Sequence, residues 1–209
     1  PDGAMLVAEL ADSYSWLASA RQSLGALQEA GRLHQRALDL VRGLRQRHPD
    51  DALWVNREVR ALQHRAALSM ALGRDDLALA DAEAAAALFA GAARLDPDNR
   101  GWQVELAHVE LDLLKIKARR QPPATLLPAL ERVHAALASA HRLDPKNALW
   151  ATSEAVARGR LASARLAAGD LAGARRDVDA ALERLRRLQT DNRSSQGSRL
   201  ALAEALLAA

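Results

Sequence analysis

The sequence repeats itself every 48 residues, and this period constrains the fold more than any other feature. Three prolines recur at that step, and each is followed five positions later by a tryptophan. The pairs are Pro49 and Trp54, Pro97 and Trp102, and Pro145 and Trp150. Self-similarity at a fixed period of roughly 20–50 residues is the signature of a solenoid, in which each repeat is one supersecondary unit stacked on the next.

A glycine keeps the same step in the middle of the repeat. It occurs at Gly25, Gly73 and Gly169, and Gln121 takes its place in the third repeat. Glycine after an apolar helical pattern is typical of a helix C-terminus, because it enters the left-handed region freely. Each repeat is therefore predicted to form a first helix (helix A), a glycine turn, a second helix (helix B) and a loop around the proline. The three tryptophans are expected to pack at the joints between repeats.

Composition favours an all-α fold. Nine Val, one Ile and three Thr are the whole β-branched content, whereas the strong helix formers Ala, Leu, Arg and Glu dominate. A single helical hairpin cannot bury its apolar face alone, so several must stack. We predict one domain, an α-solenoid of four stacked antiparallel hairpins over residues 6–53, 54–101, 102–149 and 150–195. A partial repeat, 196–209, is expected to form a trailing C-terminal helix.

Turn and capping residues set the expected helix limits. Asp75 or Asp76 is predicted to cap helix B of the second repeat, and Asp98 or Asn99 the helix that follows. In the third repeat, prolines at 122, 123 and 128 delay helix B to a start near residue 126, because proline is tolerated only in a first turn. The other predicted helices cover about 6–24, 29–47, 54–72, 75–95, 102–119, 150–168, 171–188 and 199–208.

The repeat resembles the tetratricopeptide (TPR) family. The resemblance rests on Asp-Pro-x-Asn followed by Trp, as at residues 144–150, and on segments such as 10–17 (Leu-Ala-Asp-Ser-Tyr-Ser-Trp-Leu) and 166–174 (Leu-Ala-Ala-Gly-Asp-Leu-Ala-Gly-Ala). It covers about residues 6–209 and is closest to the long variety, with a repeat near 48 residues, found in bacterial signalling proteins. The resemblance implies a protein–protein interaction scaffold whose A helices line a concave groove. Such repeats often accompany a kinase, ATPase, protease or cyclase domain.

The sequence shows no catalytic motif. It has no cysteine, no Gly-x-Ser-x-Gly segment, and no glycine-rich loop before Lys-Ser or Lys-Thr. Two Glu-x-x-His pairs, Glu105/His108 and Glu131/His134, have the spacing found in di-iron bundles, but those sites need further inward-facing carboxylates. We interpret both pairs as solvated surface. The chain is therefore expected to be no enzyme and to hold no cofactor and no metal.

The charge pattern argues against nucleic-acid binding. The net charge of +3 is spread along the chain, and few aromatic side chains are present for stacking on bases. The basic run on the last complete helix, residues 175–187, is interleaved with acidic residues and is predicted to be a solvated face with i,i+4 ion pairs. No apolar run approaches the ~18 residues that a membrane span needs. Absence of cysteine fits a reducing compartment, so we expect a cytoplasmic protein, with the periplasm open as an alternative if the chain is an excerpt.

The most informative positions form one stripe along each helix A, at i, i+3, i+7 and i+10, where the residue type changes from repeat to repeat. We name it the A-helix stripe. It could line a binding groove, or it could be a ladder of ion pairs between neighbouring repeats, and the sequence favours neither. Its members are Glu9, Asp12, Trp16 and Ser19; Arg57, Arg60, His64 and Ala67; Glu105, His108, Asp112 and Lys115; and Ser153, Val156, Arg160 and Ser163.

Within this stripe, Trp16 has no aromatic counterpart in the other repeats, and core and ligand surface are equally open for it. We predict a non-catalytic scaffold that binds a peptide or helix of a partner protein in the groove. The alternative is a regulatory or sensor segment of a larger bacterial signalling enzyme, acting in cis. The apolar C-terminal segment, with Leu202 and Leu206, also suggests self-association. The candidate partner-binding residues are Trp16, Arg57, Arg60, His64, Glu105, His108, Asp112 and Arg160.

Overall fold

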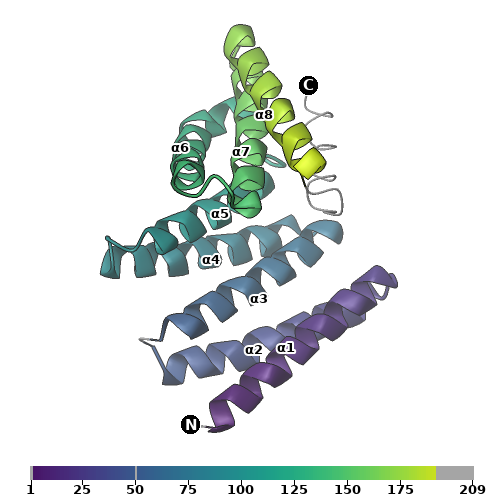
Figure 1. Ribbon diagram of the computed structural model, residues 1–209. Helices are drawn as coiled ribbons and strands as arrows, with labels where there is room; N and C mark the ends of the chain where they lie inside the picture. Colours follow the sequence, from purple (N-terminus) through teal and green to yellow (C-terminus); the bar gives the residue numbers. More distant parts are fainter. Residues whose placement is uncertain (1, 50, 192–209) are drawn as a thin grey trace. The chain divides into compact units, whose positions relative to one another are not determined.

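The computed structural model describes residues 2–49 and 51–191, and within these residues the regular structure is all helical (Figure 1). Consecutive helices pack on one another as antiparallel hairpins, α1 with α2, α3 with α4, and α7 with α8. The hairpin architecture implied by the TPR resemblance is therefore confirmed. The elements are α1 (Asp2–Ser23), α2 (Leu27–Arg47), α3 (Ala52–Ala71), α4 (Asp75–Leu95), α5 (Arg100–Lys117), the 3-10 turn η1 (Pro123–Leu126), α6 (Leu127–Leu143), α7 (Ala148–Ala167) and α8 (Leu171–Asp191).

The glycine turns of three repeats have the same backbone geometry. Gly25, Gly73 and Gly169 have φ angles of 79°, 69° and 87°, in the left-handed region. In each turn the N–H of the next residue donates to a carbonyl five positions back, for example from Arg74 to Ser69 at 2.8 Å. This is the Schellman arrangement, which satisfies carbonyls that the end of a helix leaves open. The predicted role of glycine as the helix-ending residue is confirmed.

Capping agrees with the sequence at one predicted position and differs at another. The side chain of Asn99 accepts a hydrogen bond from the N–H of Gly101 at 3.1 Å, just before α5 begins. The prediction that Asp75 or Asp76 caps α4 is wrong, because Arg74 is the N-cap residue and both aspartates lie in the first turn. Carboxylates in that turn still interact favourably with the positive end of the helix dipole.

Two further helix limits test the sequence. Helix α6 begins at Leu127 with Pro128 in its first turn, as predicted from the proline positions. Helix α8 extends to residue 191, so the expected end near residue 188 is wrong. Helices α2, α4 and α8 each have 21 residues. The predicted trailing helix over residues 199–208 lies outside the described residues.

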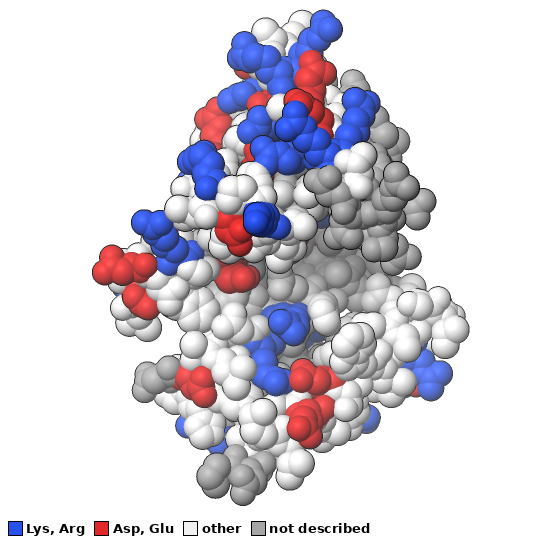
Figure 2. Space-filling view, in the orientation of Figure 1, with Lys and Arg blue, Asp and Glu red and all other residues white. Residues whose placement is uncertain are grey.

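Charged side chains of both signs share the surface of α7 and α8, in the upper part of Figure 2. Arg175 pairs with Asp179 at 4.0 Å and Arg187 pairs with Glu183, both at i,i+4 spacing. These two pairs confirm the solvated, paired face predicted for α8. Asp177 departs from that prediction, because it is buried and accepts a hydrogen bond from Arg165 of α7 at 2.6 Å.

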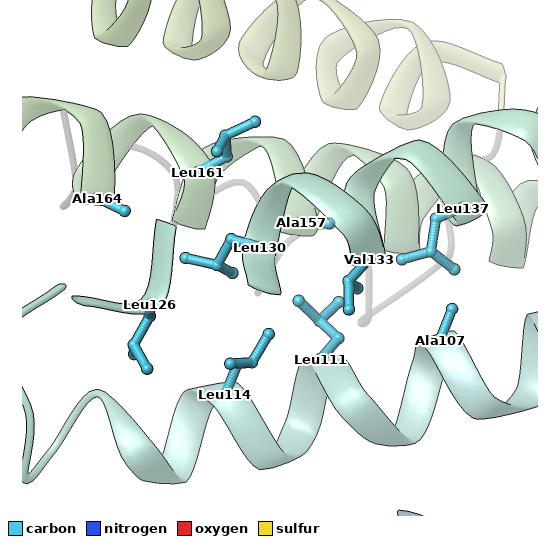
Figure 3. Close-up of a cluster of buried hydrophobic side chains, with 10 residues drawn as sticks. All are labelled: Ala107, Leu111, Leu114, Leu126, Leu130, Val133, Leu137, Ala157, Leu161 and Ala164. Atoms are coloured by element: carbon cyan, nitrogen blue, oxygen red, sulfur yellow. The ribbon is translucent and has the colours of Figure 1, made fainter. Parts of the chain in front are cut away.

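The helices form two compact units, one of residues 1–102 and one of residues 103–209. Unit 1 contains the first two hairpins and the start of α5, and unit 2 contains most of α5 with α6, α7 and α8. The core of unit 2 is an aliphatic cluster between α5, α6 and α7, with Leu126 of η1 at one end (Figure 3). Its buried members are Ala107, Leu111, Leu114, Leu126, Leu130, Val133, Leu137, Ala157, Leu161 and Ala164.

In unit 1, Trp54 shows what the tryptophan marker does. It is 3% exposed and packs with Ala8 of α1 and Leu44 of α2, so it joins the first hairpin to the second. Trp102 is half-buried, and its ring centroid lies 5.6 Å from that of Phe89. For Trp54, the expected packing at a joint between repeats is confirmed.

Candidate partner-binding groove

In unit 1 the A-helix stripe lines a pocket of about 310 Å³ between α1 and α3. Helix α1 contributes Asp12, Trp16 and Ser19 from the stripe. Helix α3 contributes Arg57, Arg60 and His64 from the facing side. Two neighbouring A helices thus bring residues that are far apart in the sequence to one hollow. The pocket is lined by Ala11, Asp12, Ser15, Trp16, Ser19, Val41, Leu53, Asn56, Arg57, Arg60, Ala61 and His64.

Trp16 is the large apolar side chain of this pocket. It is 78% exposed, so it lies on the surface and contributes little to the core. The sequence left open whether Trp16 lies in the core or on a ligand-binding surface. The structure places it on the surface, at the pocket. An exposed tryptophan next to cationic side chains can bury a large area against a partner, because aromatic side chains are the largest apolar groups available.

The two arginines of the stripe in α3 have different surroundings. The Nη1 atom of Arg57 donates to Oδ2 of Asp12 at 2.7 Å, and its guanidinium carbon lies 5.9 Å from the Trp54 ring centroid. This contact is one rung of the predicted ion-pair ladder. Arg60 is exposed and forms no ion pair within residues 2–49 and 51–191. The pocket therefore has one neutralised arginine and one arginine with its charge available.

His64 lies half-buried at the pocket and touches a second histidine. Its ring centroid is 5.6 Å from that of His34 on α2, edge to face. Burial, and then the charge of Arg60, lower the pKa of His64, so the side chain is neutral at pH 7. The Nδ1 atom of His64 is buried without a hydrogen-bond partner among the described residues. His64 therefore contributes a neutral, polar ring to the pocket.

Hydroxyl groups in the pocket are tied to the helix backbone. The Oγ atom of Ser15 donates to the carbonyl of Ala11 at 3.0 Å, and Oγ of Ser19 donates to the carbonyl of Ser15 at 3.0 Å. A serine nucleophile needs a general base within hydrogen-bond reach of its hydroxyl. Both hydroxyl groups donate instead to carbonyls of their own helix.

The stripe residues of unit 2 lie on α5 and α7. Glu105 and Asp112 are exposed, and His108 and Arg160 are half-buried. Nδ1 of His108 lies 4.0 Å from Oε2 of Glu105, one turn away. No group of three or more potential metal-binding side chains occurs in the described part of the chain. The second Glu-x-x-His pair is divided between two contacts, since Glu131 pairs with Arg165 and His134 with Glu154.

Buried acidic residues at the joints between hairpins were missed by the sequence analysis. Glu58 of α3 is 3% exposed and accepts hydrogen bonds from Arg42 and Arg45 of α2. Glu154 of α7 is 2% exposed and contacts His134 of α6 at 3.0 Å and Arg158. Each glutamate thus fastens a helix A to helix B of the preceding hairpin.

A second pair of buried acids fastens the two helices within a hairpin. Asp81 of α4 accepts two hydrogen bonds from Arg65 of α3, and Asp177 of α8 accepts one from Arg165 of α7. Glu58 and Glu154 are 96 residues apart, and so are Asp81 and Asp177. The signal that could have found them is therefore a step of two repeats. The positions one repeat before each are apolar: Leu10, Leu106, Leu33 and Ala129.

No protein-family model matches this chain, and no curated protein matches it. Among solved structures it is similar to a thermophilic TPR protein of Thermus thermophilus, with 17% sequence identity and a TM-score of 0.38. That alignment covers 94% of this chain and 99% of the other. A likeness at this level says nothing about partners or sites, and the architecture rests on the hairpins described above. None of the described helices is long and apolar enough to cross a bilayer.

Proposed function

We propose that this protein is a non-catalytic scaffold that binds a segment of a partner protein in the pocket between α1 and α3. The preferred segment carries an acidic side chain next to an apolar one. Arg60 supplies the charge that attracts the carboxylate, and Trp16 supplies the apolar surface. The observation that supports the proposal best is the placement of an exposed tryptophan and an arginine without an ion pair among the described residues at the same hollow.

In the free protein the side chains of Trp16 and Arg60 are exposed, so their burial against a partner can contribute binding energy. Exposed tryptophan and arginine are the side chains that most often dominate protein interfaces when they become buried. The contact between Arg57 and Asp12 holds α1 and α3 at a fixed spacing, so the pocket is largely formed before a partner arrives. In unit 1 the ion-pair ladder and the binding groove are therefore compatible. The Arg57–Asp12 pair joins the two helices that line the pocket, while Trp16 and Arg60 stay exposed.

A peptide display experiment tests this function directly. Random peptides of helical length are selected on the wild-type chain and then measured against Arg60→Glu and Trp16→Ala. We expect enriched peptides to combine an acidic residue with a large apolar one, and each substitution to weaken binding by about tenfold or more. Arg32→Glu is the matched control, because Arg32 is an exposed arginine on α2 that does not line this pocket.

The outcomes separate the two interpretations of the stripe. Selected peptides that lose binding with Arg60→Glu but not with Arg32→Glu support the groove. Selection without acidic enrichment, or equal binding to all variants, would show that the stripe serves only to hold neighbouring repeats together. Circular dichroism of every variant must first show an unchanged helix content.

A further inference from the structure

A second pocket of unit 1 is lined by four arginines and, among the described residues, by no acidic one. It has a volume of about 610 Å³ and lies on α2, the end of α3 and the start of α4, which follow one another in the array (Figure 1). It shares no residue with the pocket between α1 and α3. We name it the arginine pocket. Four leucines, two glutamines, a serine and a glycine complete its lining, and its arginines are Arg32, Arg36, Arg65 and Arg74.

Three of the four arginines keep their charge. Arg65 is neutralised by Asp81, whose carboxylate accepts two hydrogen bonds from it. Arg32 and Arg74 are exposed and form no ion pair in the described part of the chain. Arg36 is exposed beside a tyrosine ring, with 5.9 Å between its guanidinium carbon and the ring centroid, and this contact leaves its positive charge in place. Four arginines less one aspartate leave an excess of three positive charges.

The acidic side chains nearest in the sequence do not line this pocket. Glu29 of α2 pairs with an arginine of α1 at 3.2 Å. Asp39 accepts a hydrogen bond from a glutamine at 2.8 Å, and its charge acts on Arg65, which is already paired. Asp75 and Asp76 lie in the first turn of α4, outside the lining. The excess charge of the pocket is therefore open to an anion from solution.

Unit 2 contains the same arrangement with its charges balanced. There Arg165 of α7 makes the contacts that Arg65 makes in unit 1. It donates to the buried Asp177 of α8 at 2.6 Å and to Glu131 of the preceding helix B at 3.2 Å. A third carboxylate, that of Asp170, lies 3.9 Å from Arg165. Three carboxylates thus surround one arginine.

The positions 96 residues earlier carry different charges in unit 1. Glu131 corresponds to Gln35, which is neutral, and Asp170 corresponds to Arg74, which is cationic. Asp170 also accepts a hydrogen bond from the N–H of Gly173 at 2.8 Å, whereas the side chain of Arg74 makes no cap hydrogen bond to α4. Two carboxylates present in unit 2 are thus missing from the equivalent place in unit 1, and a bound anion would replace them.

We propose that the arginine pocket binds a small, soluble phosphate ester, with its phosphate at the arginines and its organic group against the leucines. Arginine suits phosphate because its planar fork donates two parallel hydrogen bonds. A phosphate monoester carries nearly two negative charges at neutral pH, so it matches an excess of three positive charges better than a single carboxylate does. The four leucines offer apolar surface that a bare inorganic phosphate cannot use. This site is separate from the proposed peptide groove.

Three small anions test the ligand class. Phenyl phosphate, inorganic phosphate and benzoate are titrated into isotope-labelled protein, and the NMR shift of the amide of Gly31, which lines the pocket, reports binding. We expect phenyl phosphate to bind about tenfold more tightly than either of the others. Benzoate binding as tightly would overturn the choice of phosphate, and inorganic phosphate binding as tightly would overturn the role of the leucines. An unchanged Gly31 amide at millimolar phenyl phosphate would overturn the site itself.

The residues of unit 2 supply a variant that should fold well. Gln35→Glu/Arg74→Asp gives the arginine pocket the two carboxylates that unit 2 has, and phenyl phosphate should bind to it at least about tenfold more weakly. Arg74→Ala alone should also weaken binding. The matched control Gln46→Glu/Arg100→Asp makes the same change in charge at exposed positions of unit 1 outside both pockets, and it should bind as the wild type does. Equal affinity of the two double variants would overturn the proposal.

Two further measurements separate this site from a lipid site and from the groove. A lipid phosphate has the same chemistry, so the chain is sedimented with vesicles that contain phosphatidic acid. Co-sedimentation that Gln35→Glu/Arg74→Asp abolishes would assign the pocket to a lipid headgroup and overturn the soluble ester. Arg32→Glu should weaken phenyl phosphate and leave peptides in the groove unaffected, because Arg32 lines only the arginine pocket. Phenyl phosphate is measured without any peptide, so failure of the groove proposal leaves this test intact.

Discussion

Protonation of His34 should make unit 1 sensitive to mild acid. The side chain is 2% exposed on α2 and packs edge to face against His64. Burial, with a further contribution from His64, lowers the pKa of His34 from 6.5 to about 4. Because the folded pKa lies below the unfolded one, stability is fully present above pH 6.5 and is lost as the pH falls toward 4.

The size of this effect follows from the two pKa values. The unfolded chain takes up a proton on this side chain below pH 6.5, whereas the folded chain resists protonation until about pH 4. The linkage relation gives a loss of about 2 kcal/mol of unfolding free energy between pH 7 and pH 5, and about 3 kcal/mol by pH 4. His64 responds in the same direction, because its pKa is also lowered.

The substitution His34→Leu isolates the effect. The equivalent positions in the other repeats are Ala82, Leu130 and Val178, so an apolar residue suits this place in the repeat. Urea unfolding of both proteins at pH 7, 6, 5 and 4.5 gives the difference in unfolding free energy. That difference should grow by about 2 kcal/mol in favour of His34→Leu from pH 7 to pH 5. Parallel curves for the two proteins over this range would refute the reasoning, as would an NMR titration of His34 with a midpoint near 6.5.

Three further predictions concern other parts of the chain. In unit 2, burial alone would raise the pKa of Glu154, but hydrogen bonding from His134 and the charge of Arg158 outweigh it and lower the pKa to about 2. The unfolding free energy of the wild type should therefore fall by about 2 kcal/mol between pH 5 and pH 3. Urea unfolding of Glu154→Gln should show a flatter pH dependence, and an unchanged slope would contradict the shift. Gly73→Ala should destabilise by ~1 kcal/mol at its left-handed turn, whereas Gly43→Ala within α2 should stabilise by up to ~1 kcal/mol in thermal melts. Equal effects would refute the turn argument. Leu137→Ala should cost ~2–5 kcal/mol in denaturant titrations because Leu137 is fully buried in the unit 2 cluster, and a cost below ~1 kcal/mol would contradict that packing.

Much of the fold could be predicted because its determinants are local. Gly73 and Asn99 end and begin helices through hydrogen bonds to residues within five positions, so short sequence patterns suffice to find them. The position of α6 followed from Pro128 for the same reason. The prediction for Asp75 was wrong because Arg74 and Asp75 both stand at the boundary, and the choice depends on backbone angles that residue preference alone does not set.

The candidate site could be predicted only in part. Six stripe residues meet at one pocket, since neighbouring A helices lie side by side and keep equal register. The sequence could not show that Arg57 is neutralised while Arg60 is exposed, because both are arginines one turn apart. Nor could it show that His64 is neutral, since that depends on burial and on Arg60.

The buried acids limit how the array can be extended by one hairpin. Glu58 and Glu154 each need a basic partner on the hairpin before them, and Asp81 and Asp177 each need one within their own hairpin. A copy of the second hairpin placed directly after the original would set its Glu58 against α4, where Ala90 and Ala93 stand at the positions equivalent to Arg42 and Arg45. The pairing of Asp81 with Arg65 lies within one hairpin and would survive such a duplication, whereas the copied Glu58 would lose its basic partners. An engineer who extends the array by a single hairpin must therefore also supply basic residues on the helix B that precedes the new Glu58.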